Sequence, residues 1–138
     1  MSASNPFVGK WIYRSLFNNP DFSLGFDKLE LGRAYLVIEE HGPAILGGTI
    51  GGDGWSLALH GSFGFGSPME VRFEGKGTVG GEPWIYAYTG WLVQAWPNSN
   101  DSMQRPAIVG SVTRVIAHKG SGGISPAGIV ASFFAVRA

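Results

Sequence analysis

The segment FVGKWIY, residues 7–13, opens the first apolar run of the chain, and Arg137 all but ends the last one. In an eight-stranded antiparallel barrel, the first and last strands meet along a closing seam. A Gly-x-Trp on the first strand can plug the floor there with its indole. A basic residue on the last strand can lie over that aromatic ring. Trp11 and Arg137 therefore predict a closed barrel that is plugged at one end.

The composition narrows the class of protein. With 138 residues, of which 44% are apolar, the chain predicts one domain, 1–138, with a single core. Ten basic and ten acidic residues cancel and do not cluster, so we expect neither nucleic acid nor a membrane as a partner. The lack of cysteine excludes disulfides and thiolate metal sites. Residues 1–10 carry no secretory signal and no apolar stretch reaches the length of a membrane helix, which predicts a soluble cytoplasmic protein.

Glycine and proline separate the apolar runs and do not form a block of their own. Eight segments rich in β-branched and aromatic residues result, and most gaps are short and glycine-rich, as hairpin turns require. The expected strands are 8–16, 33–41, 44–51, 55–63, 68–76, 84–96, 107–118 and 128–137. Closing sequential strands on themselves removes both free edges. We therefore predict an all-β fold, an eight-stranded antiparallel up-and-down (meander) β-barrel.

The direction of each strand in a meander decides which end of the barrel each loop occupies. If the first strand runs from floor to mouth, Trp11 and Arg137 are neighbours at the floor. The opposite end is the mouth, where a ligand would enter. The loops expected at the mouth are 17–32, 51–54, 77–83 and 118–127.

These end residues resemble the calycin superfamily of lipocalins and fatty-acid-binding proteins, and the avidins, which share the barrel. The resemblance implies a small-ligand barrel with Gly9, Trp11 and Arg137 as structural floor residues. The chain differs from lipocalins in lacking cysteines and a signal peptide. It differs from avidins at the two-residue steps after the tryptophan, where Tyr13, Ser15 and Phe17 replace the polar contacts to biotin. Biotin is therefore not the expected ligand.

Strand alternation predicts which side chains line the cup. If Trp11 points inward, Tyr13 and Ser15 lie on the same inner wall, nearer the mouth, where both could bond a ligand. Tyr13 could instead be a core aromatic whose hydroxyl meets a backbone carbonyl. Segment 84–96 sets three aromatic side chains on one face and a second apolar set on the other, so either face could point inward. The first set is Trp84, Tyr86 and Tyr88, and the second is Ile85, Ala87, Thr89 and Trp91.

The last three strands are apolar on both faces, unlike 68–76, which alternates apolar and charged residues. Exposed apolar patches of that extent are rare on monomers. The outer face of the last three strands therefore predicts a homo-oligomer.

Arg114 is a cation in the middle of an apolar strand. A buried guanidinium needs an anionic or multiply accepting partner, so Arg114 could bind a ligand carboxylate or enolate oxygen. Alternatively, it could be an exposed or interface residue paired with Glu or Asp.

The three histidines do not predict a metal site. His41 and His60 fall at the floor ends of their strands, whereas His118 falls at the mouth, so the imidazoles should not converge on one ion. An imidazole changes charge near neutral pH, which makes His118 a candidate ligand-binding group, but the pattern favours the alternative, a solvated loop histidine. The glycine spacing of 75–80 matches a dinucleotide fingerprint, but no helix follows it, so we interpret it as a hairpin and expect no cofactor.

Three functions follow from this fold, in order of preference. The first is the binding of a small, largely apolar molecule by the residues predicted above, Tyr13, Ser15, Trp84, Tyr86, Tyr88, Arg114 and His118. The second is a cofactor-independent isomerase, cyclase or lyase in the same cavity, with Tyr13, Arg114 or His118 as acid, base or oxyanion group. The third is a structural or protein-interaction barrel whose interior is filled by its own side chains.

Overall fold

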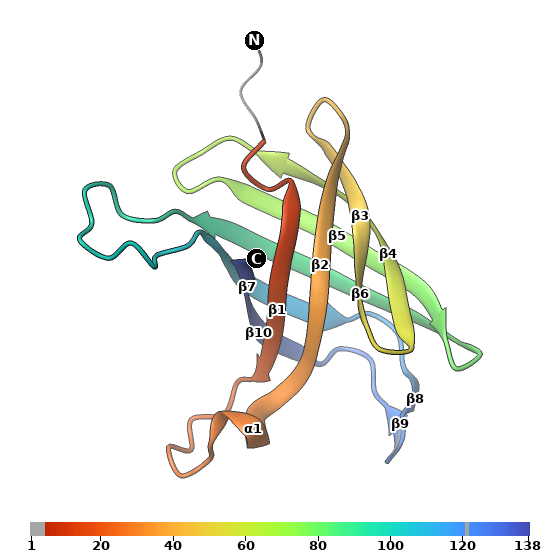
Figure 1. Ribbon diagram of the computed structural model, residues 1–138. Helices are drawn as coiled ribbons and strands as arrows, with labels where there is room; N and C mark the ends of the chain where they lie inside the picture. The colour runs from red at the N-terminus through yellow and green to blue at the C-terminus, as the bar shows by residue number, and fades with distance from the viewer. Residues whose placement is uncertain (1–4, 121) are drawn as a thin grey trace.

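The computed structural model describes residues 5–120 and 122–138, and it confirms the all-β meander barrel (Figure 1). The eight barrel strands pair antiparallel in the closed order β1-β10-β7-β6-β5-β4-β3-β2. They are β1 (Gly9–Phe17), β2 (Glu30–Gly42), β3 (Ile45–Gly52), β4 (Trp55–Gly64), β5 (Glu70–Val79), β6 (Glu82–Val93), β7 (Ala107–Arg114) and β10 (Val130–Arg137). A helical turn, α1 (Phe26–Leu29), lies between β1 and β2. Within the described ranges, no helix has the length and apolar character needed to cross a membrane.

Two predicted strands end earlier than expected. Segment 84–96 leaves the barrel after Val93, and segment 107–118 leaves it after Arg114. Val115 still bonds to Ile85 on β6, but the residues from His118 onward pair with each other and not with the wall. They form a small hairpin of β8 (His118–Gly120) and β9 (Gly123–Ser125) before β10 begins.

The seam between the first and last strands has the predicted geometry. Trp11 on β1 lies directly opposite Arg137 on β10, and the guanidinium carbon stands 4.4 Å from the centre of the indole. The guanidinium donates to the carbonyl of Val8 at 3.1 Å, and the indole N–H donates to the carbonyl of Phe7 at 2.9 Å. Gly9 has a φ of +136°, and a Cβ there would lie 2.7 Å from the Arg137 Nη1 atom. The chain therefore needs glycine at this position.

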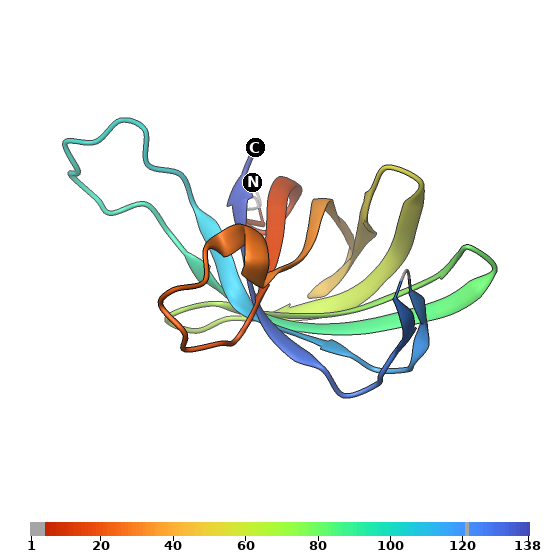
Figure 2. The same ribbon diagram turned by 90° about the horizontal axis from the view of Figure 1, so that it is seen from below.

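The loops divide between the two ends of the barrel as predicted (Figure 1). β1 runs from the end near the N-terminus to the end that carries α1. The β3–β4 and β5–β6 turns and the β8–β9 hairpin lie at that second end. Figure 2 views the barrel from this side. We call it the mouth, and we call the end that holds the Trp11 seam the floor.

The floor half of the barrel is filled by its own side chains. Inward residues of successive strands, together with Phe7 before β1, form one continuous core, which includes Trp11, Ile38, Leu46, Leu59, Val71 and Ile108. Higher in the barrel, Tyr13, Phe73 and Phe133 border a void of about 10 Å³. Such a void holds one water molecule at most. Space for a ligand must therefore lie nearer the mouth.

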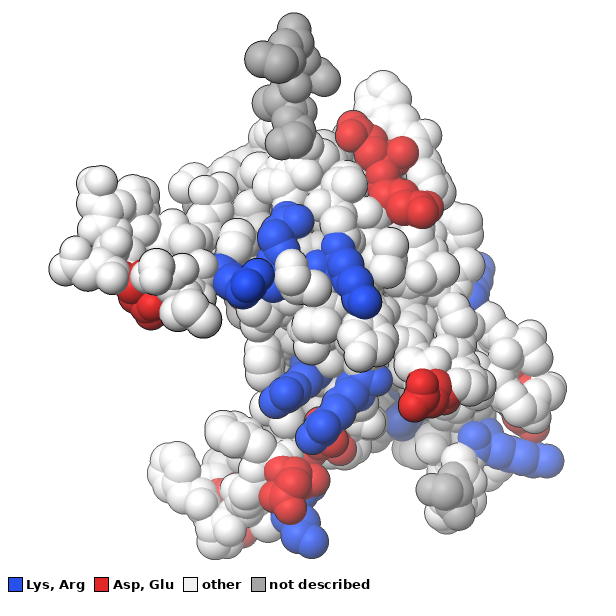
Figure 3. All heavy atoms as spheres, in the orientation of Figure 1, with Lys and Arg blue, Asp and Glu red and all other residues white. Residues whose placement is uncertain are grey.

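The outer wall is charged on one side and uncharged on another. Figure 3 shows Lys and Arg side chains gathered over β1 and β2. On β5, charged residues alternate with buried apolar ones, as predicted. In contrast, the outward positions of β6, β7 and β10 carry no charge. A row of paired residues crosses these three strands, namely Trp91, Val109 and Phe134, which are 40%, 38% and 37% exposed.

Candidate functional site

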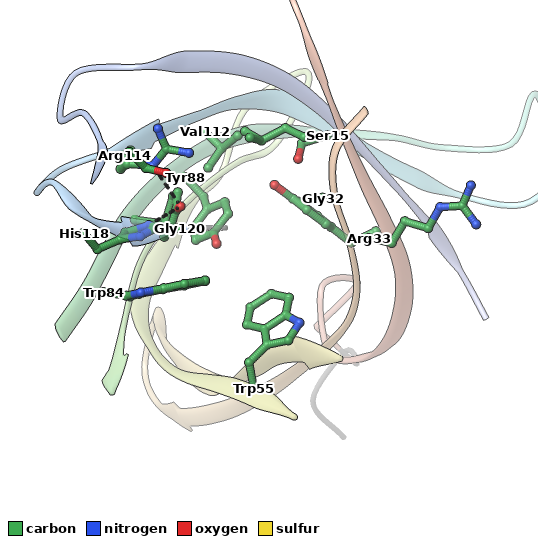
Figure 4. Close-up of a pocket in the computed structure, with 14 residues that line it drawn as sticks. Ser15, Gly32, Arg33, Trp55, Trp84, Tyr88, Val112, Arg114, His118 and Gly120 are labelled. Atoms are coloured by element: carbon green, nitrogen blue, oxygen red, sulfur yellow. Dashed lines mark hydrogen bonds between the residues drawn. The ribbon is translucent and has the colours of Figure 1, made fainter. Parts of the chain in front are cut away.

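A cavity of about 420 Å³ opens at the mouth (Figure 4). All seven residues predicted to bind a ligand line this one cavity. They are Tyr13 and Ser15 from β1, Trp84, Tyr86 and Tyr88 from β6, Arg114 at the end of β7, and His118 from the hairpin. The structure thus identifies the inward face of β6 as the Trp84, Tyr86 and Tyr88 face.

Sequence reasoning missed seven further lining residues, Leu31, Gly32, Arg33, Trp55, Val112, Gly120 and Ser125. Trp55 is the largest of them. It could have been found, because it precedes Leu57 and Leu59 at two-residue steps and therefore shares their inward face. The Arg33 side chain points away from the cavity (Figure 4) and forms an ion pair with Glu30. Arg33 therefore borders the cavity without offering its charge to it.

Two tyrosines form the base of the cavity. Tyr13 stacks on Phe133 with ring centres 5.3 Å apart, and Tyr88 meets Tyr13 edge to face at 6.0 Å. Burial raises the pKa of both phenols above the ordinary value of 10.0, and the two hydroxyls would repel each other as phenolates. Tyr13 is thus both a core aromatic and a lining residue. Both rings stay neutral at physiological pH.

An aromatic wall rises from this base on the side of β4 and β6. Trp84 stacks on the His118 imidazole, with ring centres 4.1 Å apart and planes inclined by 16°. The ring of Trp55 lies 6.1 Å from that of Trp84 at an angle of 43°. Both indoles project into the cavity in Figure 4. The wall presents flat apolar surface to any molecule that enters.

A hydrogen-bonded chain joins Arg114, Tyr86 and His118. The Arg114 Nε–H donates to the Tyr86 hydroxyl at 3.1 Å, and that oxygen lies 2.9 Å from His118 Nε2. His118 Nδ1 lies 3.1 Å from the Lys119 carbonyl, which can only accept. Nδ1 therefore carries a proton, and in the neutral imidazole Nε2 accepts from the hydroxyl of Tyr86. Every member of the chain is held in a single orientation.

Arg114 is buried, with 8% of its surface exposed. Its Nη1 donates to the carbonyl of Pro126 at 3.2 Å, so both of its protein partners are neutral oxygens. No carboxylate within the described residues pairs with it, although such a pair was one of the two alternatives from the sequence. The guanidinium is therefore a buried charge without a counter-ion in the described chain.

The histidines lie apart, as predicted. His41 is exposed beside Glu39 at 3.1 Å, and His60 points outward from β4. His118 is buried, so the alternative of a solvated loop residue is wrong. Across residues 5–120 and 122–138, no cluster of three His, Cys, Asp or Glu side chains is arranged to hold a metal ion.

Comparison of the chain with protein-family models, with curated proteins and with solved structures finds no match. The resemblance to calycins therefore depends only on the residues at the two chain ends and on the barrel architecture. Its closed eight-stranded antiparallel barrel is the architecture that the resemblance implied.

Proposed function

We propose that the protein binds a small, largely apolar molecule in the mouth cavity. The observation that carries this proposal is a cavity of about 420 Å³ that combines aromatic walls with a few oriented polar groups. Small-molecule sites typically enclose about 300–1,000 Å³ with this kind of lining. The seam of Gly9, Trp11 and Arg137 supports a calycin-like relationship, in which such a cavity would hold a ligand.

The construction of the barrel supports a binding role. The filled floor gives the cavity a rigid base, and the hydrogen-bonded chain fixes the polar groups before a ligand arrives. A site that is ordered in advance spends less of its binding energy on ordering side chains. Apolar contact with the two indoles then contributes roughly 25 cal/mol for each Å² removed from water.

Binding can be tested with 1-naphthamide, a neutral flat molecule that fits the volume. We expect saturable quenching of the intrinsic tryptophan fluorescence and a complex of one probe per chain in native mass spectra. The Trp84→Ala variant should bind the probe about 10-fold more weakly, because it removes one wall. The control is Trp96→Ala, in the connection at the floor end, which should bind as the wild type does. An absence of saturable binding, or equal affinity in both variants, would contradict the proposal.

The two other functions expected from the sequence stay predictions. The chain of Arg114, Tyr86 and His118 would suit a proton transfer to or from a bound molecule, as the enzyme hypothesis requires. The filled floor half suits a structural barrel, but the mouth cavity favours a ligand. The cytoplasmic location also stays a prediction.

We also infer that copies of this chain associate through the uncharged outer face of β6, β7 and β10. The row of Trp91, Val109 and Phe134 at its centre is contiguous through the strand pairing. An uncharged face can meet a second copy of itself without opposing like charges. It also leaves apolar surface in water if it stays uncovered.

Light scattering at micromolar concentration should give a mass of two or more chains. The Val109→Glu variant should give the mass of one, because a carboxylate would be buried without a partner. The matched control is Ala58→Glu on the outer face of β4, which should keep the wild-type mass. A wild-type mass of one chain would overturn self-association, and an unchanged mass for Val109→Glu would exclude this face.

A further inference from the structure

Arg114 presents more hydrogen-bond donors than the protein uses. A guanidinium has five N–H groups. The described chain accepts from two of its nitrogens, with the Tyr86 hydroxyl bonded to Nε and the Pro126 carbonyl bonded to Nη1. Nη2 has no hydrogen-bond acceptor among the described residues, and Arg114 lines the cavity. The cavity wall therefore offers a free donor on a positive charge.

Two acidic residues near the mouth pair with other cations. Glu82 lies 3.7 Å from Lys119, and Glu30 pairs with Arg33 outside the cavity. The cavity lining itself contains no Asp or Glu. A buried charge is stable only when it is paired. The partner that Arg114 lacks in the described chain would have to come from the molecule in the cavity.

The hydrogen-bonded chain points to the same kind of ligand. In the neutral imidazole, the Tyr86 hydroxyl donates its proton to His118 Nε2, and Nδ1 faces the Lys119 carbonyl. Within this chain, donation to a ligand therefore comes from Arg114. A ligand that complements it carries acceptors, and a planar oxyanion matches the fork of a guanidinium best. A cationic ligand would meet the charge of Arg114 without a compensating acid.

The position of the charge also orients the ligand. Arg114, at the end of β7, is hydrogen-bonded to Tyr86. In Figure 4 it lies across the cavity from Trp55. The apolar part of a ligand would then lie against the indoles of Trp55 and Trp84, with its acidic group at the guanidinium. The ligand must therefore carry an apolar part at one end and an acidic group at the other.

We infer that the ligand of the mouth cavity is a small aromatic carboxylate whose anionic group binds Arg114. The inference rests on the proposed function and adds the charge and the chemical class of the ligand.

The test compares 1-naphthoate with 1-naphthamide, which has nearly the same size and shape but no charge. Wild-type protein should bind naphthoate about 10- to 100-fold more tightly than naphthamide, as for hydrogen bonds to a charged group. The Arg114→Met variant keeps a long side chain, and it should lose that preference, so that the two probes bind with about equal affinity. Arg72→Met on the outer face of β5 is the control, and it should keep the wild-type preference.

Each result decides a separate question. Equal affinity for the two probes in wild-type protein would overturn the inference that the ligand is a carboxylate. It would leave the proposed binding function unaffected. A failure of both probes to bind would overturn the binding function itself. If Arg114→Met does not fold, the comparison of the two probes on wild-type protein still decides the charge of the ligand. Arg114→Lys, which keeps the charge but loses the fork, should then retain an intermediate preference.

Discussion

Replacing Trp11 with alanine is expected to lower the free energy of unfolding by about 3–5 kcal/mol, as for other fully buried large aromatic side chains. Trp11 is completely buried at the floor, where three interactions depend on it. Its indole packs in the core, its N–H satisfies the buried carbonyl of Phe7, and its face lies under the guanidinium of Arg137. At the seam that closes the barrel, the substitution leaves a cavity, a Phe7 carbonyl without its donor and an Arg137 guanidinium without its cation–π partner.

Urea unfolding followed by circular dichroism would measure this loss. The matched control is Trp96→Ala, whose side chain is 77% exposed, and it should change the stability by less than about 0.5 kcal/mol. Trp11→Phe should fall between the two, because a phenyl ring still lies under Arg137 but cannot donate to Phe7. Equal stability of Trp11→Ala and Trp96→Ala would show that the seam does not depend on the indole.

The seam could be predicted from sequence because each of its parts requires a particular residue type. Gly9 has a positive φ and no room for a Cβ, the indole fills the floor, and only a long cation on the last strand reaches over it. Regular alternation then placed Tyr13 and Ser15 on the inner wall. These inferences use only residue types and their spacing along each strand, and both can be read directly from the sequence.

The inward face of β6 could not be predicted, because alternation requires one polar face to define direction. β6 is apolar on both sides, so Trp84 and Trp91 were equally good candidates for the interior. Closure of the barrel decides between them, since only one face of each strand can join the core made by its neighbours. That decision depends on pairing across the whole sheet and not on the strand itself.

The β8–β9 hairpin was missed for a different reason. The sequence from 107 to 118 is apolar enough to be one strand. Its last residue, His118, instead pairs with Ser125 in a separate hairpin outside the barrel wall. The consequence for the site is large. The hairpin brings His118 over Trp84 and within reach of Tyr86, contacts that a straight strand would not make.

Tyr13 and Tyr88 are expected to make the protein lose stability steeply above pH 10. Burial raises the pKa of each phenol above the ordinary value of 10.0, which is also the value in the unfolded chain. Their contribution to stability is complete below pH 10. As the pH rises further, the unfolded chain releases protons that the native chain keeps, so the equilibrium shifts towards unfolding. The loss continues until the pH reaches the raised pKa of the folded state.

The size of this effect follows from proton linkage. Each buried tyrosine should cost about 1.36 kcal/mol per pH unit, so the pair should cost about 2.7 kcal/mol per unit. Two pH units above 10 would remove about 5 kcal/mol, which is comparable to the whole stability of many domains. Urea midpoints measured from pH 9 to 12 would test this, with absorbance at 295 nm reporting phenolate formation.

Tyr13→Phe should reduce this slope by about half, because it removes one of the two linked protons. Tyr35→Phe is the matched control, since Tyr35 lies on the outer face of β2 with 54% of its surface exposed. It should leave the slope unchanged. Comparing slopes cancels any constant loss from the missing hydroxyl, and it cancels lysine titration that the variants share. Phenolate absorbance that reaches its full value while the barrel is still folded would mean that the base of the cavity admits water, and a ligand there would have to compete with it.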